Sequence, residues 1–242
     1  MQLHIHKTPP ELSQALAEWI TTTIETTLKT SSRFTFVVTG GNSPKKLYEL
    51  LAASPYKERI DWKKLHIFWG DERAVPFTDS RNNAKMTFEH LLNHVPVVQE
   101  QVHIMDTTLE PAEAAKAYEK ILHKYFDDKG ATFDLVLNGM GDDGHTLSLF
   151  PYTEVIHENK AWVKAFYLKP QEMYRITLTA PLVNRSKNIV FLTFGSNKAH
   201  ALNAVLTGRG TADQYPSQMI KPVHGELHWF VDEEAAAFLN KN

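Results

Sequence analysis

The residues best suited to acid–base chemistry lie in the stretch FDLVLNGMGDDGHTLSLFP, at positions 133–151. Two carboxylates, Asp142 and Asp143, and the imidazole of His145 stand there among three closely spaced glycines. A histidine can accept a proton near neutral pH, and glycines let the backbone turn sharply and approach a ligand. The stretch therefore predicts an acid–base site centred on His145.

A second polar segment, Asp71-Glu72-Arg73, follows the apolar run at positions 65–69. Charged groups are costly to bury without partners, so the simplest interpretation is surface charge. The functional interpretation is that the carboxylate of Asp71 and the guanidinium of Arg73 face the same crevice as His145. Both interpretations place the segment at the end of a predicted strand.

A third polar segment could bind phosphate. A glycine turn joins the apolar run at positions 34–39 to a helix that is predicted to start near Pro44. Backbone N–H groups and the positive end of the helix dipole attract an anion at such a turn. The alternative is a tight turn in which Asn42 or Ser43 only caps the helix. The candidate phosphate ligands are Gly40, Gly41, Asn42 and Ser43.

Two cations farther along the chain are further candidates. Lys198 lies in the first turn of a helix predicted after the apolar run at positions 189–194. A cation there opposes the helix dipole, and a bound anion would offset that cost. Arg175 stands near the start of a strand predicted at positions 175–179. These groups suggest a phosphate pocket beside an acid–base centre.

The polar segments are positioned by apolar segments that alternate along the chain. Strands are predicted at positions 3–6, 34–39, 65–69, 102–105, 133–137, 162–166, 175–179, 189–194 and 227–231. Helices are predicted between most of them. This order predicts one α/β domain over residues 1–242, doubly wound around a mostly parallel sheet with helices on both faces. Ligands of such sheets bind at the carboxyl ends of the strands.

Two local predictions concern chain segments after the polar turns. Ser148 is a conceivable nucleophile, but no G-x-S-x-G elbow surrounds it, so we assign it to a helix. Asp232 is predicted to cap a short final helix.

The composition excludes several classes of protein. The 242 residues include no cysteine, so disulfides, thiolate nucleophiles and cysteine-ligated metal sites are impossible. A net charge of -2 does not indicate a basic protein that would attract nucleic acid or an anionic membrane. No apolar leader or membrane-length run is present. We expect a cytoplasmic enzyme or binding protein without nucleic-acid or membrane partners.

Neither a metal nor a nucleotide cofactor is expected. His4 and His6 could share one face of an edge strand, but a third metal ligand is not evident. The segment Gly139–Gly144 matches the dinucleotide pattern G-x-G-x-x-G, yet its two aspartates would repel a pyrophosphate. Pro151 also interrupts the helix that should follow.

Five blocks of the chain, in order, resemble a known family. The blocks are GGNSP at 40–44, GDERAVP at 70–76, GMGDDGHTLSLFP at 139–151, RITL at 175–178 and GSNKA at 195–199. They are similar to the G-G-S-T-P, D-E-R-x-V-P, G-M-G-x-D-G-H-T-A-S-L-F-P, R-I-T and G-x-x-K-A segments of 6-phosphogluconolactonases, a family related to glucosamine-6-phosphate deaminases. The likeness covers nearly the whole chain.

This sequence departs from the family pattern at several positions. Asn42 and Ser43 stand where Ser and Thr are usual, and Asp142 replaces a Pro. The segment at positions 80–83, Ser-Arg-Asn-Asn, leaves open whether Asn82 or Asn83 matches the family's asparagine.

The resemblance implies hydrolysis of 6-phospho-glucono-1,5-lactone to 6-phosphogluconate, without a metal or a cofactor. It implies that His145 activates water, that Asp143 orients or polarises the site, and that Arg73 helps to position the substrate. The implied phosphate ligands are the turn at positions 41–43, Arg175 and Lys198. The implied fold is the deaminase-like modified Rossmann sheet. The expected partner is a phosphosugar lactone, and the expected state is a monomer or a weak homo-oligomer.

Two rival functions remain open. A deaminase carries the signature D-G-H-x-A-F-N-E-P, with a carboxylate where this chain has Phe150. An apolar ring cannot move protons, which disfavours the deaminase. A non-catalytic sugar-phosphate sensor would keep the phosphate turn and lose the base, and the presence of His145 disfavours it.

Overall fold

A seven-stranded parallel sheet forms the centre of the molecule in the computed structural model, which describes residues 1–127 and 129–239. Every pairing between its neighbouring strands is parallel. The spatial order is β1 (Gln2–His6), β10 (Glu226–Asp232), β9 (Asn188–Thr193), β6 (Leu135–Gly139), β2 (Phe34–Val38), β3 (Leu65–Trp69) and β5 (Val102–His103).

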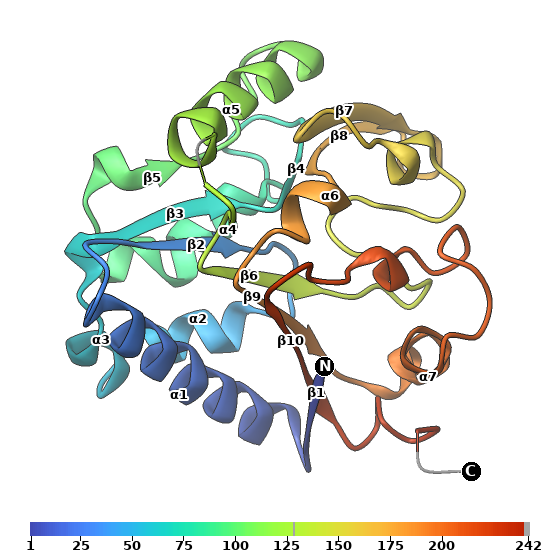
Figure 1. Ribbon diagram of the computed structural model, residues 1–242, viewed down its shortest axis with the longest axis horizontal. Coiled ribbons are helices and arrows are strands. Elements are labelled where there is room, and N and C mark those ends of the chain that lie inside the picture. Colours follow the sequence, from blue (N-terminus) through green and yellow to red (C-terminus); the bar gives the residue numbers. More distant parts are fainter. Residues whose placement is uncertain (128, 240–242) are drawn as a thin grey trace.

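Helices cover both faces of this sheet (Figure 1). One apolar core packs α1 (Pro9–Leu28), α2 (Lys45–Leu51), α3 (Tyr56–Arg59) and α4 (Asn83–His90) against one face. A second core packs α5 (Pro111–Phe126), α6 (Ala180–Val183) and α7 (Ala199–Thr207) against the other. The predicted doubly wound, mostly parallel α/β fold is thus confirmed. Short 3₁₀ helices lie at Trp62–Lys64, Leu92–His94, Gln99–Gln101, Glu154–His157, Lys169–Gln171, Ser196–Lys198 and Pro216–Met219.

A separate three-stranded antiparallel sheet was not predicted from the sequence. It consists of β4 (Asp71–Arg73), β8 (Met173–Leu178) and β7 (Val163–Leu168), in that order. The strands predicted near positions 162–166 and 175–179 belong to it rather than to the central sheet. The segment Asp71–Arg73 is therefore a strand whose register sets Arg73 opposite Arg175.

The order of the central strands reverses between β2 and β6. From β2 the chain builds outward through β3 to β5, and it then returns to β6 on the other side of β2. The later strands continue from β6 toward β1. Ligands of open α/β sheets bind at such a switch point, outside the carboxyl ends of the strands. The turns that follow β2 and β6 flank this position.

Two local predictions are wrong. Residues 233–239, where a final helix was predicted, form successive turns instead. The carboxylate of Asp232 accepts hydrogen bonds from the backbone N–H groups of Gly195 and Ala235, which joins this segment to the end of β9. Ser148 lies in an irregular segment and not in a helix.

The first strand is at the edge of the sheet, as predicted, and His4 lies beside His228, with 3.3 Å between their ring nitrogens. The residues with described positions contain no group of three or more metal-ligating side chains placed to hold an ion. None of the helices in residues 1–127 and 129–239 is both long and apolar enough to cross a membrane.

Candidate active site

His145 and Asp143 form a hydrogen-bonded pair in the loop after β6. His145 Nδ1 lies 2.6 Å from Asp143 Oδ1, and the same oxygen accepts the backbone N–H of His145 at 3.0 Å. Burial alone would raise the pKa of Asp143, but the hydrogen bond and the charge of His145 hold it below its usual value. An ionised carboxylate only accepts, so Nδ1 carries the proton and Nε2 presents a lone pair. The pair can therefore act as a general base.

Backbone hydrogen bonds within the loop, and contacts with Ser217, fix the loop that carries this pair. The N–H of Gly141 donates to the carbonyl of His145 at 2.8 Å, and the carbonyl of Gly144 accepts both the N–H and the hydroxyl of Ser217. A Cβ atom at Gly141 would lie only 2.1 Å from His145 Nδ1. Glycine at that position is thus required for the close approach of the imidazole.

An apolar ring supports the imidazole from one side. The rings of His145 and Phe150 stack with centroids 4.1 Å apart and an angle of 22°. Phe150 is itself buried, and the guanidinium carbon of Arg175 lies 5.6 Å from its ring centroid. Asp143 and Phe150 line a cavity of about 880 Å³ beside the β7–β8 hairpin, so Asp143 lies next to open space.

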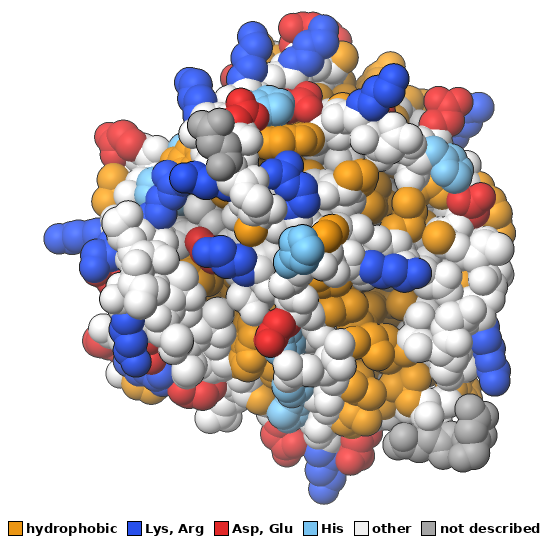
Figure 2. Space-filling view, viewed as in Figure 1, with side chains coloured by type: hydrophobic (Ala, Val, Ile, Leu, Met, Phe, Trp, Pro, Cys, Tyr) orange, Lys and Arg blue, Asp and Glu red, His pale blue; other side chains and the backbone are white. Residues whose placement is uncertain are grey.

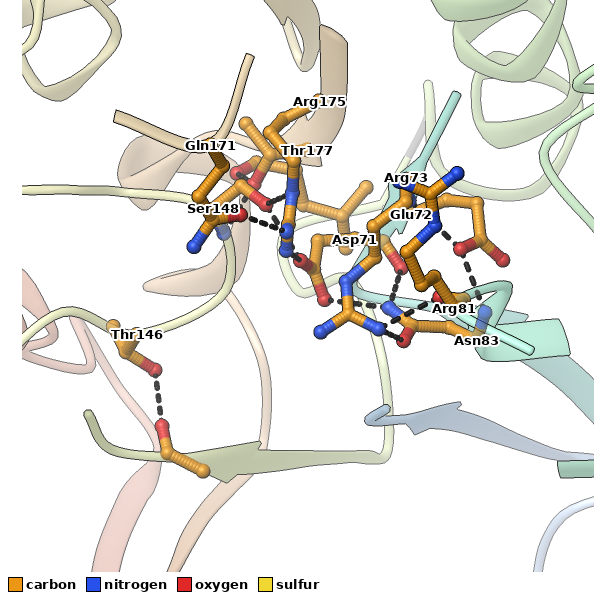
Figure 3. Close-up of polar contacts among 12 residues, drawn as sticks. Asp71, Glu72, Arg73, Arg81, Asn83, Thr146, Ser148, Gln171, Arg175 and Thr177 are labelled. Carbon is orange, nitrogen blue, oxygen red and sulfur yellow. Dashed lines mark hydrogen bonds and ion pairs between the residues drawn. The ribbon is translucent and has the colours of Figure 1, made fainter. Parts of the chain in front are cut away.

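Asp71 is buried at the centre of an ion-pair network (Figure 3). Its Oδ2 accepts from Arg175 Nη2 at 2.7 Å and from the hydroxyl of Ser148 at 2.6 Å. Arg175 also donates from Nε to Ser148 and from Nη1 to Gln171. Burial alone would raise the pKa of Asp71, but the charges of Arg175 and Arg73 keep it below its usual value.

This network changes the interpretation of three predicted residues. The surface-charge interpretation of Asp71 is wrong, because only 5% of the residue is exposed and its partners are Arg175 and Ser148. Ser148 is fully buried and committed to those two partners, which is unsuitable for a nucleophile. The charge of Arg175 is balanced by Asp71, so Arg175 is part of this ion-pair network and is not a free cation.

A second, partly buried network holds Arg73. Its Nη1 donates to the carbonyl of Arg81 and to Asn83 Oδ1, both at 2.8 Å. Asn83 Nδ2 in turn donates to the backbone carbonyl of Asp71 at 2.9 Å. The Nε atom of Arg73 is buried and has no partner among the described residues. Figure 3 shows Asp71 between this group and the Arg175–Ser148 group.

The two asparagines that the sequence left undecided have different positions. Asn82 is the N-cap of α4, where its side chain accepts the N–H of Lys85 at 2.8 Å. Asn83 is the residue that contacts Arg73 and Asp71. The sequence indicated only that one of the pair belongs to the site.

The candidate phosphate turn follows β2 and touches the same network. A Cβ atom at Gly40 would lie 1.8 Å from Asn83 Oδ1, so this glycine packs directly against Asn83. Gly41 has a φ of +86°. The alternative in which Asn42 or Ser43 caps α2 is wrong, because Pro44 is the N-cap and α2 has no side-chain cap. The side chains of Asn42 and Ser43 thus do not cap α2.

Lys198 follows β9, on the other side of β6 from β2. It ends a short 3₁₀ helix and is the N-cap of α7, so it stands just before the helix and not within its first turn. The loop with His145 is thus flanked in the sheet order by the turn at positions 40–43 and by Lys198. Sequence spacing alone did not identify Ser148 as a partner of Asp71 and Arg175, because these lie 77 and 27 residues away along the chain. Gln171 and Asn83 lie only 4 and 10 residues from Arg175 and Arg73, but no motif marked either as a partner.

The comparisons with known proteins agree on one family. The model of the family described as "Glucosamine-6-phosphate isomerases/6-phosphogluconolactonase" matches residues 7–229. The chain is 36% identical over 220 residues to a 6-phosphogluconolactonase of Synechocystis, with 89% of each chain covered. It is 37% identical over 225 residues to a 6-phosphogluconolactonase of Nostoc, with 91% of each covered.

Solved structures give the same result for the fold. A 6-phosphogluconolactonase from Trypanosoma cruzi superposes with a TM-score of 0.85 at 26% identity, over 99% of this chain and 97% of that one. A monomeric glucosamine-6-phosphate deaminase superposes with a TM-score of 0.84 at 20% identity, over 98% of this chain and 99% of that one. At that identity the second likeness concerns the fold alone.

Proposed function

This chain belongs to the family of glucosamine-6-phosphate isomerases and 6-phosphogluconolactonases, and we propose that it hydrolyses 6-phospho-D-glucono-1,5-lactone to 6-phospho-D-gluconate. This reaction is a step of the oxidative pentose phosphate pathway. The relatives named 6-phosphogluconolactonase, at 36% and 37% identity over most of the chain, support the substrate. The observation that carries the proposal is the His145–Asp143 pair stacked on Phe150.

The first step is attack of water on the lactone carbonyl. Asp143 accepts from Nδ1 of His145, so Nε2 can take a proton from water as the oxygen attacks C1. A tetrahedral intermediate with a negative oxygen forms. Arg73 is the cation proposed to position the substrate, and with nearby backbone N–H groups it would stabilise the oxyanion.

The second step opens the ring. The intermediate collapses to a carboxyl group, and the bond between C1 and the ring oxygen breaks. Protonated His145 returns its proton to the ring oxygen, which becomes the hydroxyl of the open chain. The histidine is then neutral again, and water and lactone have become one acid.

The phosphate group is proposed to lie against the turn at positions 40–43 and Lys198. Both follow strands that flank β6, the strand that leads to His145. The turn offers backbone N–H groups and the side chains of Asn42 and Ser43, which cap no helix. Lys198 supplies a positive charge. Arg175 is proposed to attract the phosphate through its charge without a direct hydrogen bond, because its guanidinium is already bonded to Asp71, Ser148 and Gln171.

The experiment that tests this proposal compares substrates. Purified protein is assayed with 6-phospho-glucono-1,5-lactone, with glucono-1,5-lactone and with glucosamine 6-phosphate. We expect hydrolysis of the phosphorylated lactone well above the spontaneous rate, a much higher KM for the unphosphorylated lactone, and no ammonia. Ammonia release from glucosamine 6-phosphate would support the deaminase instead, and binding without turnover would support a sensor.

A further inference from the structure

Glu72 is a buried carboxylate whose hydrogen-bond partners, within residues 1–127 and 129–239, are backbone N–H groups. It is 1% exposed, and Oε1 accepts the N–H groups of Arg73 and Asn83, both at 2.7 Å. Oε2 accepts the N–H of Ala84 at 2.8 Å. Burial raises the pKa of this carboxyl to about 7, although the three N–H groups lower it. Burying a carboxylate is costly, and these three hydrogen bonds offset part of that cost.

These hydrogen bonds join β4 to the first turn of α4. Asn83 and Ala84 are the first two residues of that helix, and their N–H groups have no partner within it. Asn82, the N-cap, satisfies the next N–H, that of Lys85. The side chain of Glu72 thus adds to the capping of α4. Glu72 lies in β4, and a loop separates that strand from the helix.

The residue that Glu72 fixes in place is also the one that holds Arg73. The backbone N–H of Asn83 donates to the Glu72 carboxylate, and the side-chain oxygen of Asn83 accepts from Arg73 Nη1 at 2.8 Å. The carboxylate also binds the backbone N–H of Arg73 itself. Arg73 is therefore held at its backbone by Glu72, and at its guanidinium by Asn83 and by the carbonyl of Arg81. Of the two guanidinium contacts, the one with Asn83 leads to Glu72, as Figure 3 shows.

We propose that Glu72 is a positioning residue, which fixes Asn83 and through it directs the Arg73 guanidinium toward the bound lactone. This inference rests on the proposed function, because Arg73 is assigned there to the substrate. Glu72 itself touches no substrate atom. Its contribution to the reaction is the geometry of Arg73, and a group misplaced by about 1 Å can lower a rate by orders of magnitude.

The test is a double-mutant cycle on kcat/KM for 6-phospho-glucono-1,5-lactone. Glu72→Gln keeps the shape but turns an N–H group toward the backbone donors, so at least one hydrogen bond is lost. We expect kcat/KM to fall about tenfold or more, the scale of one misplaced charged contact. Arg73→Ala should lower it at least as far. The double variant should be no slower than Arg73→Ala alone, because Glu72 acts through Arg73.

The matched control is Asn82→Ala, which removes a cap at the same helix end without touching Arg73. It should lower the melting temperature and leave kcat/KM within about twofold of wild type, since cap loss affects stability. If Glu72→Gln does not yield folded protein, Glu72→Asp is measured in the same cycle, with the same expectation.

Two results would overturn the inference. One is a folded Glu72→Gln enzyme with wild-type kcat/KM. The other is a loss that is fully additive with Arg73→Ala. Both are distinct from failure of the proposed function, which would appear as a wild-type protein without lactonase activity.

Discussion

At the scale of single residues, the central feature is the hydrogen bond between Asp143 and His145. The carboxylate keeps its pKa below the usual value, so it remains ionised through the neutral range. It therefore fixes the proton of His145 on Nδ1 and leaves a lone pair on Nε2, the atom that we propose as the base. The charge of Asp143 should matter more than its shape.

This leads to a prediction for Asp143→Asn. The variant keeps the size of the side chain but loses the charge that orients the imidazole and stabilises its protonated form. We expect kcat to fall by about 10- to 100-fold, with little change in KM, because His145 keeps part of a general-base contribution that is usually about 10²–10⁴-fold. Asp142→Asn removes the neighbouring exposed charge and serves as the control, with an expected change below about threefold. Equal effects of the two substitutions would argue against a special role for Asp143.

A second prediction at this scale concerns Lys198. Because the proposed contact is with a remote phosphate, Lys198→Ala should raise KM for the phosphorylated lactone by about tenfold while kcat changes little. Steady-state kinetics with the phosphorylated and unphosphorylated lactones checks this, since KM for the latter should not respond. Lys46→Ala, at an exposed position of α2, is the control. An unchanged KM for the phosphorylated lactone would remove Lys198 from the phosphate site.

At the scale of elements, the small antiparallel sheet positions the charged side chains. β4 and β8 face each other in register, and the ion pair between Asp71 and Arg175 joins them across 104 residues of sequence. Breaking a buried pair leaves an uncompensated charge, which typically costs about 3–5 kcal/mol. Loss of either partner should therefore weaken the contact between the two strands.

Arg175→Met tests this dependence. We expect the free energy of unfolding in urea to fall by about 3–5 kcal/mol, because Asp71 stays buried without its partner. The double variant Asp71→Asn/Arg175→Met should recover part of the loss. Arg81→Met, which breaks a largely exposed pair with Asp79, should cost less than about 1 kcal/mol. If Arg175→Met proves as stable as wild type, the ion pair does not hold the sheet.

The same elements show where sequence reasoning succeeds and where it ends. Each strong strand of the central sheet is a continuous apolar run, a pattern that local sequence carries, so those predictions held. β4 consists of three charged residues and has no such pattern. Its burial depends on Arg175, and the position of Ser148 depends on Asp71, 77 residues away. Such long-range pairing leaves no mark on local periodicity.

The site was predictable to the same extent. His145 and Asp143 lie two residues apart, so their spacing alone suggested a shared site. The contact between Asn83 and Glu72 depends on where α4 begins, and the sequence placed that start only to within a few residues. The final helix failed as a prediction because Asp232 binds the distant N–H of Gly195 as well as a local one.

At the scale of the whole molecule, two cores on opposite faces of one sheet hold the site in place. β6 lies in the middle of that sheet and leads directly into the loop with His145. Its residue Asn138 is fully buried, and neither polar atom of its side chain has a partner among the described residues. A buried amide left without a hydrogen-bond partner costs about 1–3 kcal/mol, so we expect this position to lower the stability of the fold.

Asn138→Leu should therefore raise the free energy of unfolding by about 1–3 kcal/mol, since a side chain of similar size replaces the unpaired amide. Thermal and urea denaturation of the purified variant measure it. Leu137→Ala, one position away in the same strand, should instead destabilise the fold by about 2–5 kcal/mol. A loss of stability in Asn138→Leu would mean that an ordered water or a shifted neighbour satisfies the amide.

The central claim, that His145 activates water, is tested most directly by the rate of lactone hydrolysis in His145→Ala. The rate is measured above the spontaneous reaction, in protein whose fold is verified by circular dichroism, with His224→Ala at an exposed position as the control. We predict a loss of about 10²-fold or more in kcat for His145→Ala and none for His224→Ala. A folded His145→Ala enzyme with the wild-type rate would contradict the assignment, because another group would then have to activate the water.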